Sequence, residues 1–154
     1  MPHTMLVLDT NIISETLKKQ PDDRVIAWLL QNQESLYLSA VTIGELWEGA
    51  YRLPTGKRRE NLLRALERIT GAYANRLLSY DGAAAQAYAL MQDKTRRGGR
   101  TLTVEDGMIA AICATAHATL ATRNTKDFQH LGITLVNPFE DPTELLGVAC
   151  RGIV

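Results

Sequence analysis

Four acidic residues stand where predicted strands end or predicted helices begin. Asp9 directly follows a short apolar run, and Glu45 lies early in the helix predicted after the second such run. Asp106 lies in the first turn of a later predicted helix, and Asp127 lies in the loop after the fourth predicted strand. In open α/β sheets, ligands collect outside the carboxyl ends of the strands. We therefore expect the four acids to converge at one edge of a sheet.

Each of these acids also has an ordinary structural interpretation. Asp9 is a good N-cap for the helix that follows it. Glu45 has the spacing from Thr42 that a capping box requires. Asp106 suits the first turn of its helix, where the helix dipole favours an acid, and Asp127 is an ordinary loop residue. The chemical interpretation rests on the joint pattern of the four acids and not on any one of them.

A divalent cation would explain why acids gather in one place. Carboxylates within a few ångströms of each other repel, and at least one pKa rises unless a cation lies between them. Mg²⁺ binds oxygen ligands, keeps several waters, and needs only one or two carboxylates directly. Such a site also needs small polar side chains that orient the ligands and the water. Suitable neighbours in the sequence are Thr10, Asn11, Ser14, Thr122 and Asn124.

Short apolar runs alternate with amphipathic stretches along the chain, as strands and helices do in α/β proteins. The predicted strands cover residues 5–8, 36–38, 77–80, 119–122 and 134–136. The predicted helices cover about 11–19, 23–31, from Ser39 or Thr42 to 53, 57–75, 81–96 and 104–117, with a short turn or helix at 125–131. The pattern predicts an α/β fold in which a central parallel sheet of about five strands is flanked by helices.

The composition is that of an ordinary globular chain. Its 154 residues predict a single domain spanning 1–154, and 45% hydrophobic with 22% charged residues argues against disorder. Seventeen basic and seventeen acidic residues exclude a protein surface that is basic all over, so a nucleic acid must be bound by a local basic patch. Two cysteines and three histidines lack disulfide or zinc spacing, which favours a reducing, cytoplasmic setting. We see no signal peptide and no membrane-spanning run, and segment 141–154 has no predicted structure.

Four segments of the chain resemble the motifs of the PIN domain family. Asp9, Glu45, Asp106 and Asp127 occupy the acidic positions of these motifs. The segments are LVLDTNIISE at 6–15, LSAVTIGEL at 38–46, TVEDGMIAA at 103–111 and ATRNTKDF at 121–128. The resemblance covers about residues 5–138, in order and with plausible spacing. The branch that it resembles most is the VapC/FitB-type toxins of bacterial toxin–antitoxin pairs.

This resemblance implies a PIN-like fold and a metal-dependent ribonuclease that uses Mg²⁺ or Mn²⁺. It makes Asp9 and Asp106 the principal metal ligands, and Glu45 either a ligand or the residue that orients the attacking water. The fourth position is open between Asn124 and Asp127, because the acid of the fourth motif varies within the family. The resemblance also implies a homodimer and a protein antitoxin that lies in an apolar groove and points a basic side chain at the acids.

Basic residues near the acids are candidates for contacts with RNA phosphates. The segment with Arg96, Arg97 and Arg100 is short and precedes Asp106 in the chain. Arg123 and Lys126 lie in the fourth motif. A solvated helix face is the alternative for such residues, and no aromatic residues alternate with them as stacking platforms for single-stranded RNA.

Three other functions remain open from the sequence. A haloacid-dehalogenase-like phosphatase would place a second acid two residues after Asp9, but Asn11 stands there. A receiver-like signalling domain would have paired acids near the first strand and another order of motifs. A PIN fold kept only for protein binding is the third alternative, which the complete set of acids disfavours.

Overall fold

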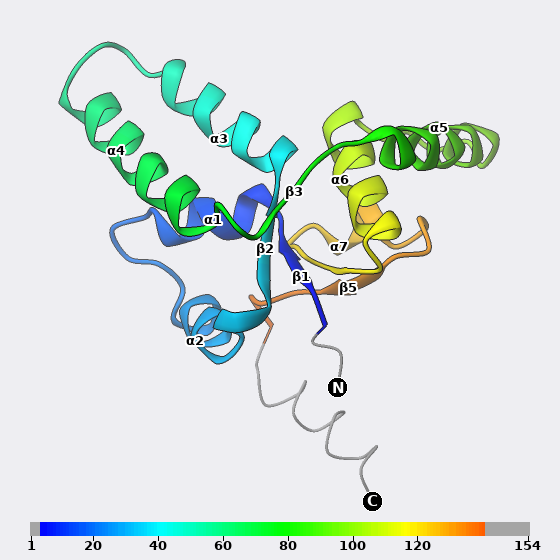
Figure 1. Cartoon of the computed structure of the whole chain (residues 1–154), viewed down its shortest axis with the longest axis horizontal. Helices are drawn as coiled ribbons and strands as arrows, with labels where there is room; N and C mark the ends of the chain where they lie inside the picture. The colour runs from blue at the N-terminus through cyan, green and yellow to red at the C-terminus, as the bar shows by residue number, and fades with distance from the viewer. Residues whose placement is uncertain (1–3, 141–154) are drawn as a thin grey trace, which may run out of the picture.

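The computed structural model describes residues 4–140, and segment 141–154, for which no structure was predicted, lies outside the described residues. Its centre is a five-stranded sheet with the order β3-β2-β1-β4-β5, in which every neighbouring pair is parallel (Figure 1). The strands are β1 Leu6–Leu8, β2 Leu36–Ser39, β3 Leu77–Leu78, β4 Thr119–Ala121 and β5 Thr134–Val136. The predicted α/β class and the central parallel sheet are therefore confirmed.

Strand β1 lies in the middle of the sheet and is covered on both faces. It pairs with β2 through Leu6 and Leu36, and with β4 through Leu8 and Ala121. Successive side chains of a strand point to opposite faces. Val7 accordingly belongs to one buried cluster and Leu8 to another, and both are fully buried. A strand buried on both faces reads as a continuous apolar run, as this one does.

Seven α-helices cover the sheet in the described part of the chain. Their bounds are α1 Thr10–Thr16, α2 Asp23–Gln31, α3 Ala40–Tyr51, α4 Lys57–Ala72, α5 Gly82–Arg97, α6 Val104–Thr115 and α7 Thr125–Phe128, with a short 3₁₀ turn at Gln33–Ser35. One buried cluster joins β1 and β2 to the first four helices, whereas the other joins β1 and β4 to α6 and α7. The chain is thus layered helix, sheet, helix.

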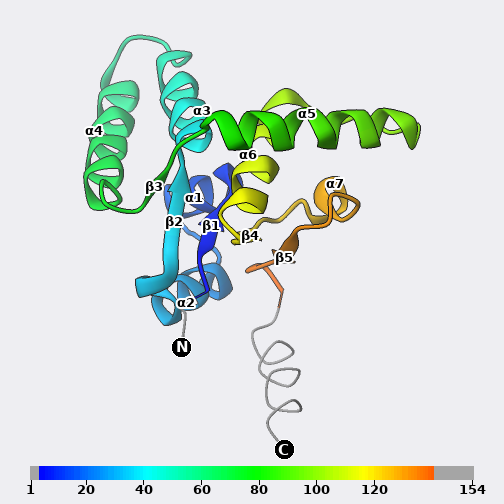
Figure 2. The ribbon, with the colours of Figure 1, turned by 45° about the vertical axis from the view of Figure 1, so that its right-hand side comes forward.

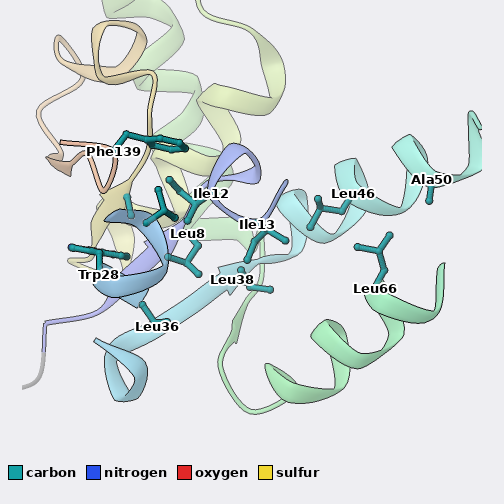
Figure 3. Close-up of a cluster of buried hydrophobic side chains, with 12 residues drawn as sticks. Leu8, Ile12, Ile13, Trp28, Leu36, Leu38, Leu46, Ala50, Leu66 and Phe139 are labelled. Carbon is teal, nitrogen blue, oxygen red and sulfur yellow. The ribbon is translucent and has the colours of Figure 1, made fainter. Parts of the chain in front are cut away.

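Helices α3 and α4 lie side by side and stand out from the sheet, away from α5 (Figures 1 and 2). Leu46 and Ala50 of α3 and Leu66 of α4 are buried in the same cluster as Leu8 and Ile12. Figure 3 shows Leu46 and Leu66 pointing toward each other between the two helices. The apolar faces of both amphipathic helices therefore pack into one shared core.

The predicted helices occur in the structure, and several are shorter than the apolar pattern suggested. Helix α1 ends at Thr16 instead of near residue 19, α4 at Ala72 instead of near 75, and α6 at Thr115 instead of near 117. Residue His117 has a φ of 53°, which a helix cannot contain. Of the two caps considered for α3, Ser39 is the one used, because its hydroxyl accepts from the backbone N–H of Thr42 at 3.1 Å.

Helices α5 and α6 pack closely at Gly107. A Cβ added at this position would lie 2.8 Å from Cε2 of Tyr88, which is too close for two carbon atoms. Tyr88 is also held in place, since its ring meets that of Tyr80 edge-on at 6.3 Å between centroids. Gly107 therefore sets the distance between α5 and α6, and it is the residue after Asp106.

No helix among residues 4–140 is both long enough and apolar enough to cross a membrane.

Replacing Gly107 with Ala should destabilise the protein by about 1–3 kcal/mol, because overpacking a tight contact forces side chains or backbone to shift. Gly49→Ala is the matched control, because a Cβ at this helical position meets nothing within 4 Å. Relief of the helix penalty of glycine should make that variant as stable as the wild type or up to about 1 kcal/mol more stable. Urea denaturation of both variants measures the difference, and equal stability of the two would contradict the close packing at Gly107.

Candidate active site

Asp9 is held at the end of β1 by hydrogen bonds to both of its carboxylate oxygens. Oδ1 accepts from the backbone N–H of Thr10 at 2.8 Å. Oδ2 accepts from the hydroxyl of Thr122 at 2.7 Å and from the side-chain amide of Asn11 at 3.1 Å. The residue caps α1, as its ordinary interpretation predicted, and it also lines a cleft. Asp9 can therefore cap α1 and line the cleft at the same time.

Thr122 joins the end of β4 to the end of β1. It is fully buried, and besides donating to Asp9 it accepts from the amide of Asn11 at 3.3 Å and from the backbone N–H of Asn124 at 3.0 Å. Asn11 in turn accepts from the backbone N–H of Arg123 at 3.1 Å. These bonds fix the start of the fourth motif beside the first. Thr122 and Asn11 thus orient Asp9, in the supporting positions that the sequence suggested.

Glu45 reaches the same place from α3. Its Oε1 accepts from the hydroxyl of Thr10 at 2.9 Å, and that hydroxyl also lies 3.4 Å from the hydroxyl of Thr42. The carboxylate therefore points toward the end of β1 and does not close a capping box with Thr42. The helix begins where β2 ends, so the parallel pairing of β1 and β2 brings Glu45 close to Asp9.

Asp106 comes from the first turn of α6, whose N-cap is Thr103. Its backbone N–H donates to the Thr103 hydroxyl at 3.2 Å, which fixes the turn that carries the carboxylate. Asp9, Glu45 and Asp106 together line a cleft of about 390 Å³. Among the remaining residues that line it are the predicted neighbours Thr10, Asn11, Ser14 and Asn124.

The pKa values of all three carboxyl groups are raised, chiefly by burial and in part by nearby negative charges. Burial raises the pKa of Asp9, and the hydrogen bond from Thr122 opposes this rise in part. Burial also raises the pKa of Glu45, and the charges of Asp9 and Asp106 add to the effect. Burial and the charge of Asp9 raise the pKa of Asp106. Carboxylates that disfavour one another's ionised form are what a cation site would show in the absence of its cation.

The fourth acid stands apart from the other three. Asp127 lies on α7, is exposed, and is not among the residues that line the cleft, whereas Asn124 is. The charge of Asp127 nevertheless raises the pKa of Asp9 and of Asp106. Asp127 is therefore close enough to act on the cleft electrostatically, whereas Asn124 lies at its wall.

Three further residues, Glu15, Lys18 and Phe139, line the cleft. Glu15 is buried, lies 2.7 Å from the ammonium of Lys18, and accepts from the backbone N–H of Asp22 at 3.0 Å. Acid and base three residues apart were the only sequence signal for this pair. Phe139 carries the guanidinium of Arg123 over its ring at 4.6 Å from the centroid. It follows the last recognisable motif, so no pattern pointed to it.

The donor set fits a hard divalent cation. Within residues 4–140, none of the ion pairs involves Asp9, Glu45 or Asp106, so their charges have no partner from the protein there. No three His, Cys, Asp or Glu side chains in this range are already close enough to hold an ion. Mg²⁺ is compatible with this arrangement, since one or two direct carboxylates suffice and water completes its shell.

A second and larger hollow of about 1060 Å³ adjoins the cleft. Its apolar lining comes from α1, α3 and α4, and includes Leu17, Leu46, Leu53, Leu62 and Leu66. Thr10, Ser14, Lys18 and Glu45 line both the hollow and the acidic cleft. We call this hollow the α1/α3/α4 groove. Because the walls are shared, a chain lying in the groove would reach Glu45.

The comparisons with known proteins agree with this geometry. The family model described as the PIN domain matches residues 6–133, which is most of the chain. The chain belongs to the PIN domain family. That membership agrees with the parallel sheet and with the order of the motifs, and it removes the phosphatase-like and receiver-like alternatives, which require other folds.

Relatives of this PIN domain chain are similar over nearly their whole length. It is 41% identical over 138 residues to VapC ribonuclease Y4jK of Sinorhizobium fredii, covering 88% of this chain and 99% of that protein. It is 40% identical to plasmid stability protein StbB of Pseudomonas syringae pv. tomato, again covering 88% and 99%. It is 39% identical to toxin FitB of Neisseria gonorrhoeae, covering 89% and 100%.

A solved structure with the same fold is that of FitAcB from Neisseria gonorrhoeae. The TM-score is 0.83 at 38% identity, and the match covers 88% of this chain and 99% of that one. The predicted PIN-like fold is confirmed by this likeness together with the sheet order.

Asp106→Asn should make the metal-free protein more stable at pH 7. The pKa of Asp106 is raised in the folded chain, so the fold holds the proton more tightly than the unfolded chain does, and stability falls as the pH rises through that window. The positive end of α6 offsets part of the effect, so we expect a gain below about 1 kcal/mol. Thermal unfolding in EDTA from pH 3 to pH 8 measures it. A variant less stable than wild type at every pH would contradict the repulsion.

Asp9→Asn should behave differently, although it removes the same charge. One of its amide hydrogens would face the Thr122 hydroxyl, which already accepts from Asn11 and Asn124. The side-chain amide of Asn11 would also lose a charged acceptor. A hydrogen bond to a charged group is worth about 1.5–3 kcal/mol, so we expect this variant to be less stable than Asp106→Asn in the same unfolding series.

Proposed function

We propose that this PIN domain protein is a metal-dependent endoribonuclease and the toxin of a toxin–antitoxin pair. The observation that carries the proposal is the set of three carboxylates, Asp9, Glu45 and Asp106, which line one cleft without a positively charged partner among the described residues. The names of the relatives support the substrate class and the toxin role, since they include a VapC ribonuclease and the toxin FitB.

Asp9 and Asp106 are the proposed metal ligands, and Mg²⁺ or Mn²⁺ the proposed ion. When bound, such an ion lowers the pKa of a coordinated water and offsets the charge of the phosphate in the transition state. The residues of the chain do the rest. Thr122 and Asn11 hold Asp9 in one orientation, and the Thr103 cap holds the turn that carries Asp106. These positions are set before the substrate arrives, which is what an active site requires.

Glu45 is the proposed acceptor for the proton of the attacking water. Its Oε1 is oriented by Thr10, while Oε2 has no hydrogen-bond partner among the described residues. Burial and the neighbouring acids raise its pKa. A general base works best when its pKa approaches the working pH, so a raised pKa suits this role.

The basic residues near the cleft are not equivalent as RNA contacts. Arg123 lines the cleft, with its guanidinium stacked on Phe139, and Lys126 is exposed on α7. Arg96 and Arg97 both lie 2.9 Å from carboxylate oxygens of Asp93. We therefore propose that Arg123 contacts the phosphate in the cleft, whereas the charges of Arg96 and Arg97 are already taken up by Asp93.

An antitoxin is the proposed partner, and the α1/α3/α4 groove is its proposed site. The resemblance to VapC/FitB-type toxins implies a protein segment in an apolar groove, and the groove here is mostly apolar. Its shared wall with the cleft at Glu45 would let a basic side chain of the bound segment approach the acids. The same resemblance supports a homodimer, and we propose that the protein acts on RNA in the cytoplasm.

Glu45→Gln should abolish RNA cleavage in the presence of Mg²⁺. Loss of a general base typically lowers the rate by about 10²–10⁴-fold. The matched control is Glu105→Gln, because Glu105 is exposed, adds its negative charge to the same acids, and does not line the cleft. The control should cleave RNA at a rate within a few-fold of the wild-type rate. EDTA should stop cleavage by the control and by the wild type. We would measure cleavage of a structured RNA panel with matched metal.

In a bacterial host without a partner protein, wild type and Glu105→Gln should arrest growth and Glu45→Gln should not. Equal growth of all three strains, with the proteins folded and abundant, would favour a PIN domain that only binds other proteins.

The fourth position is tested by a Mg²⁺ titration of Asp127→Asn and Asn124→Ala. If Asp127 helps to hold the ion through water, its loss should raise the Mg²⁺ concentration for half-maximal cleavage by about 10–100-fold. Asn124→Ala should shift the midpoint less, since a neutral amide adds little attraction for a cation. An unchanged midpoint for Asp127→Asn with a large shift for Asn124→Ala would assign the fourth role to Asn124.

A further inference from the structure

A small cavity outside the cleft lies between the end of α5 and the residues after α7. It has a volume of about 80 Å³, and its walls include Met91, Thr95, Arg100, His130 and Leu131. The chain after α5 turns back on itself, because the backbone N–H of Arg100 donates to the carbonyl of Thr95 at 3.0 Å. Gly99, at φ 70°, makes this reversal possible. The turn brings Arg100 beside the buried side of the helix.

Two polar atoms at this cavity have no hydrogen-bond partner within residues 4–140. Thr95 is 3% exposed, and its Oγ1 makes no hydrogen bond to any described residue. Nε2 of His130 is likewise buried and unpartnered there. A buried polar group without a partner costs about 1–3 kcal/mol, so a molecule in the cavity that accepts hydrogen bonds from both atoms would remove that cost. Oγ1 of Thr95 and Nε2 of His130 can each donate a hydrogen bond.

The cations at the cavity also lack partners. Lys94 and Arg100 line it, and neither forms an ion pair with any residue in the described range. Their neighbours Arg96 and Arg97 differ, since both pair with Asp93. Two hydrogen-bond donors and two unpaired cations around 80 Å³ define a site for a small anion with several acceptor oxygens. The apolar residues Met91 and Leu131 close part of the wall.

The cavity is close in the chain to two of the acids. Arg100 precedes Asp106 by six residues, and His130 follows Asp127 by three. Three residues span at most about 11 Å, so the wall at His130 is within that distance of Asp127 along the backbone. A nucleic acid strand carries its charges at regular intervals, so a strand that enters the cleft also presents phosphates on either side of it.

We propose that this cavity binds a phosphate group of the RNA strand, at a position beside the phosphate that is cut. Lys94 and Arg100 supply the charge, and Thr95 and His130 supply hydrogen bonds to its oxygens. The inference rests on the proposed ribonuclease function. It explains why the chain keeps two unpartnered polar atoms in a packed region.

Thr95→Val tests the site with almost no change of shape. It removes an unpartnered hydroxyl, so without phosphate the variant should be as stable as wild type or more stable. In EDTA, which prevents cleavage, its dissociation constant for a single-stranded RNA should rise about tenfold or more, the loss expected for a hydrogen bond to a charged group. Arg100→Gln should weaken binding as well and lower the salt dependence by about one phosphate contact.

Arg96→Gln is the matched control, because this arginine is paired with Asp93 and does not line the cavity. It should bind RNA within about twofold of wild type. A second arm uses inorganic phosphate against chloride at equal ionic strength. Stabilisation by phosphate in wild type that is lost in Thr95→Val shows that the cavity accepts free phosphate, and RNA binding then decides whether the strand uses it.

Unchanged RNA binding in both Thr95→Val and Arg100→Gln would overturn the inference, and so would a loss in Arg96→Gln as large as in Arg100→Gln. These results are separable from a failure of the proposed function. If wild type cleaves RNA with Mg²⁺ and Thr95→Val binds RNA normally, only the phosphate site is wrong. If wild type cleaves no RNA at all, the ribonuclease proposal itself fails.

Discussion

The burial of three carboxylates close to one another is the constraint around which this structure is organised. Burial and the neighbouring negative charges raise the pKa values of Glu45 and Asp106, and burial does the same for Asp9. No lysine or arginine in the described range pairs with them. The protein therefore holds its acids in an arrangement that is unfavourable without a cation, and the stability of the remaining fold must offset that cost.

The parallel sheet makes the arrangement possible. With β1 between β2 and β4, the strand ends that carry Asp9, Ser39 and Thr122 meet at one edge. The 2.7 Å hydrogen bond from Thr122 to Asp9 then ties the first motif to the fourth. The core on both faces of β1 resists separation of these strands, so the acids cannot relax apart. Active sites are commonly built in this way, with the reacting side chains held in place by a rigid scaffold.

The strands, the helices and three of the acids were predictable because they follow local rules. Apolar runs marked β1 and β4, and caps at Ser39, Asp81 and Thr103 marked helix starts. Other features depend on which residues meet in space. The Glu15–Lys18 pair lies at the cleft because of the way α1 leaves the end of β1. The stacking of Arg123 on Phe139 belongs to the cleft only because the chain returns there after β5. The exposed position of Asp127 likewise depends on how α7 is turned, which no spacing reveals.

The most direct test is a crystal of the protein grown with MnCl₂ and measured at the manganese absorption edge. We expect an anomalous peak between the carboxylates of Asp9 and Asp106, with ligand distances near the roughly 2.0–2.6 Å typical of hard divalent cations. Glu45 should lie within reach of a water on that ion. A well-ordered cleft with both carboxylates in place and no peak between them, or a peak only at another site, would contradict the assignment of this cleft as the metal-dependent active site.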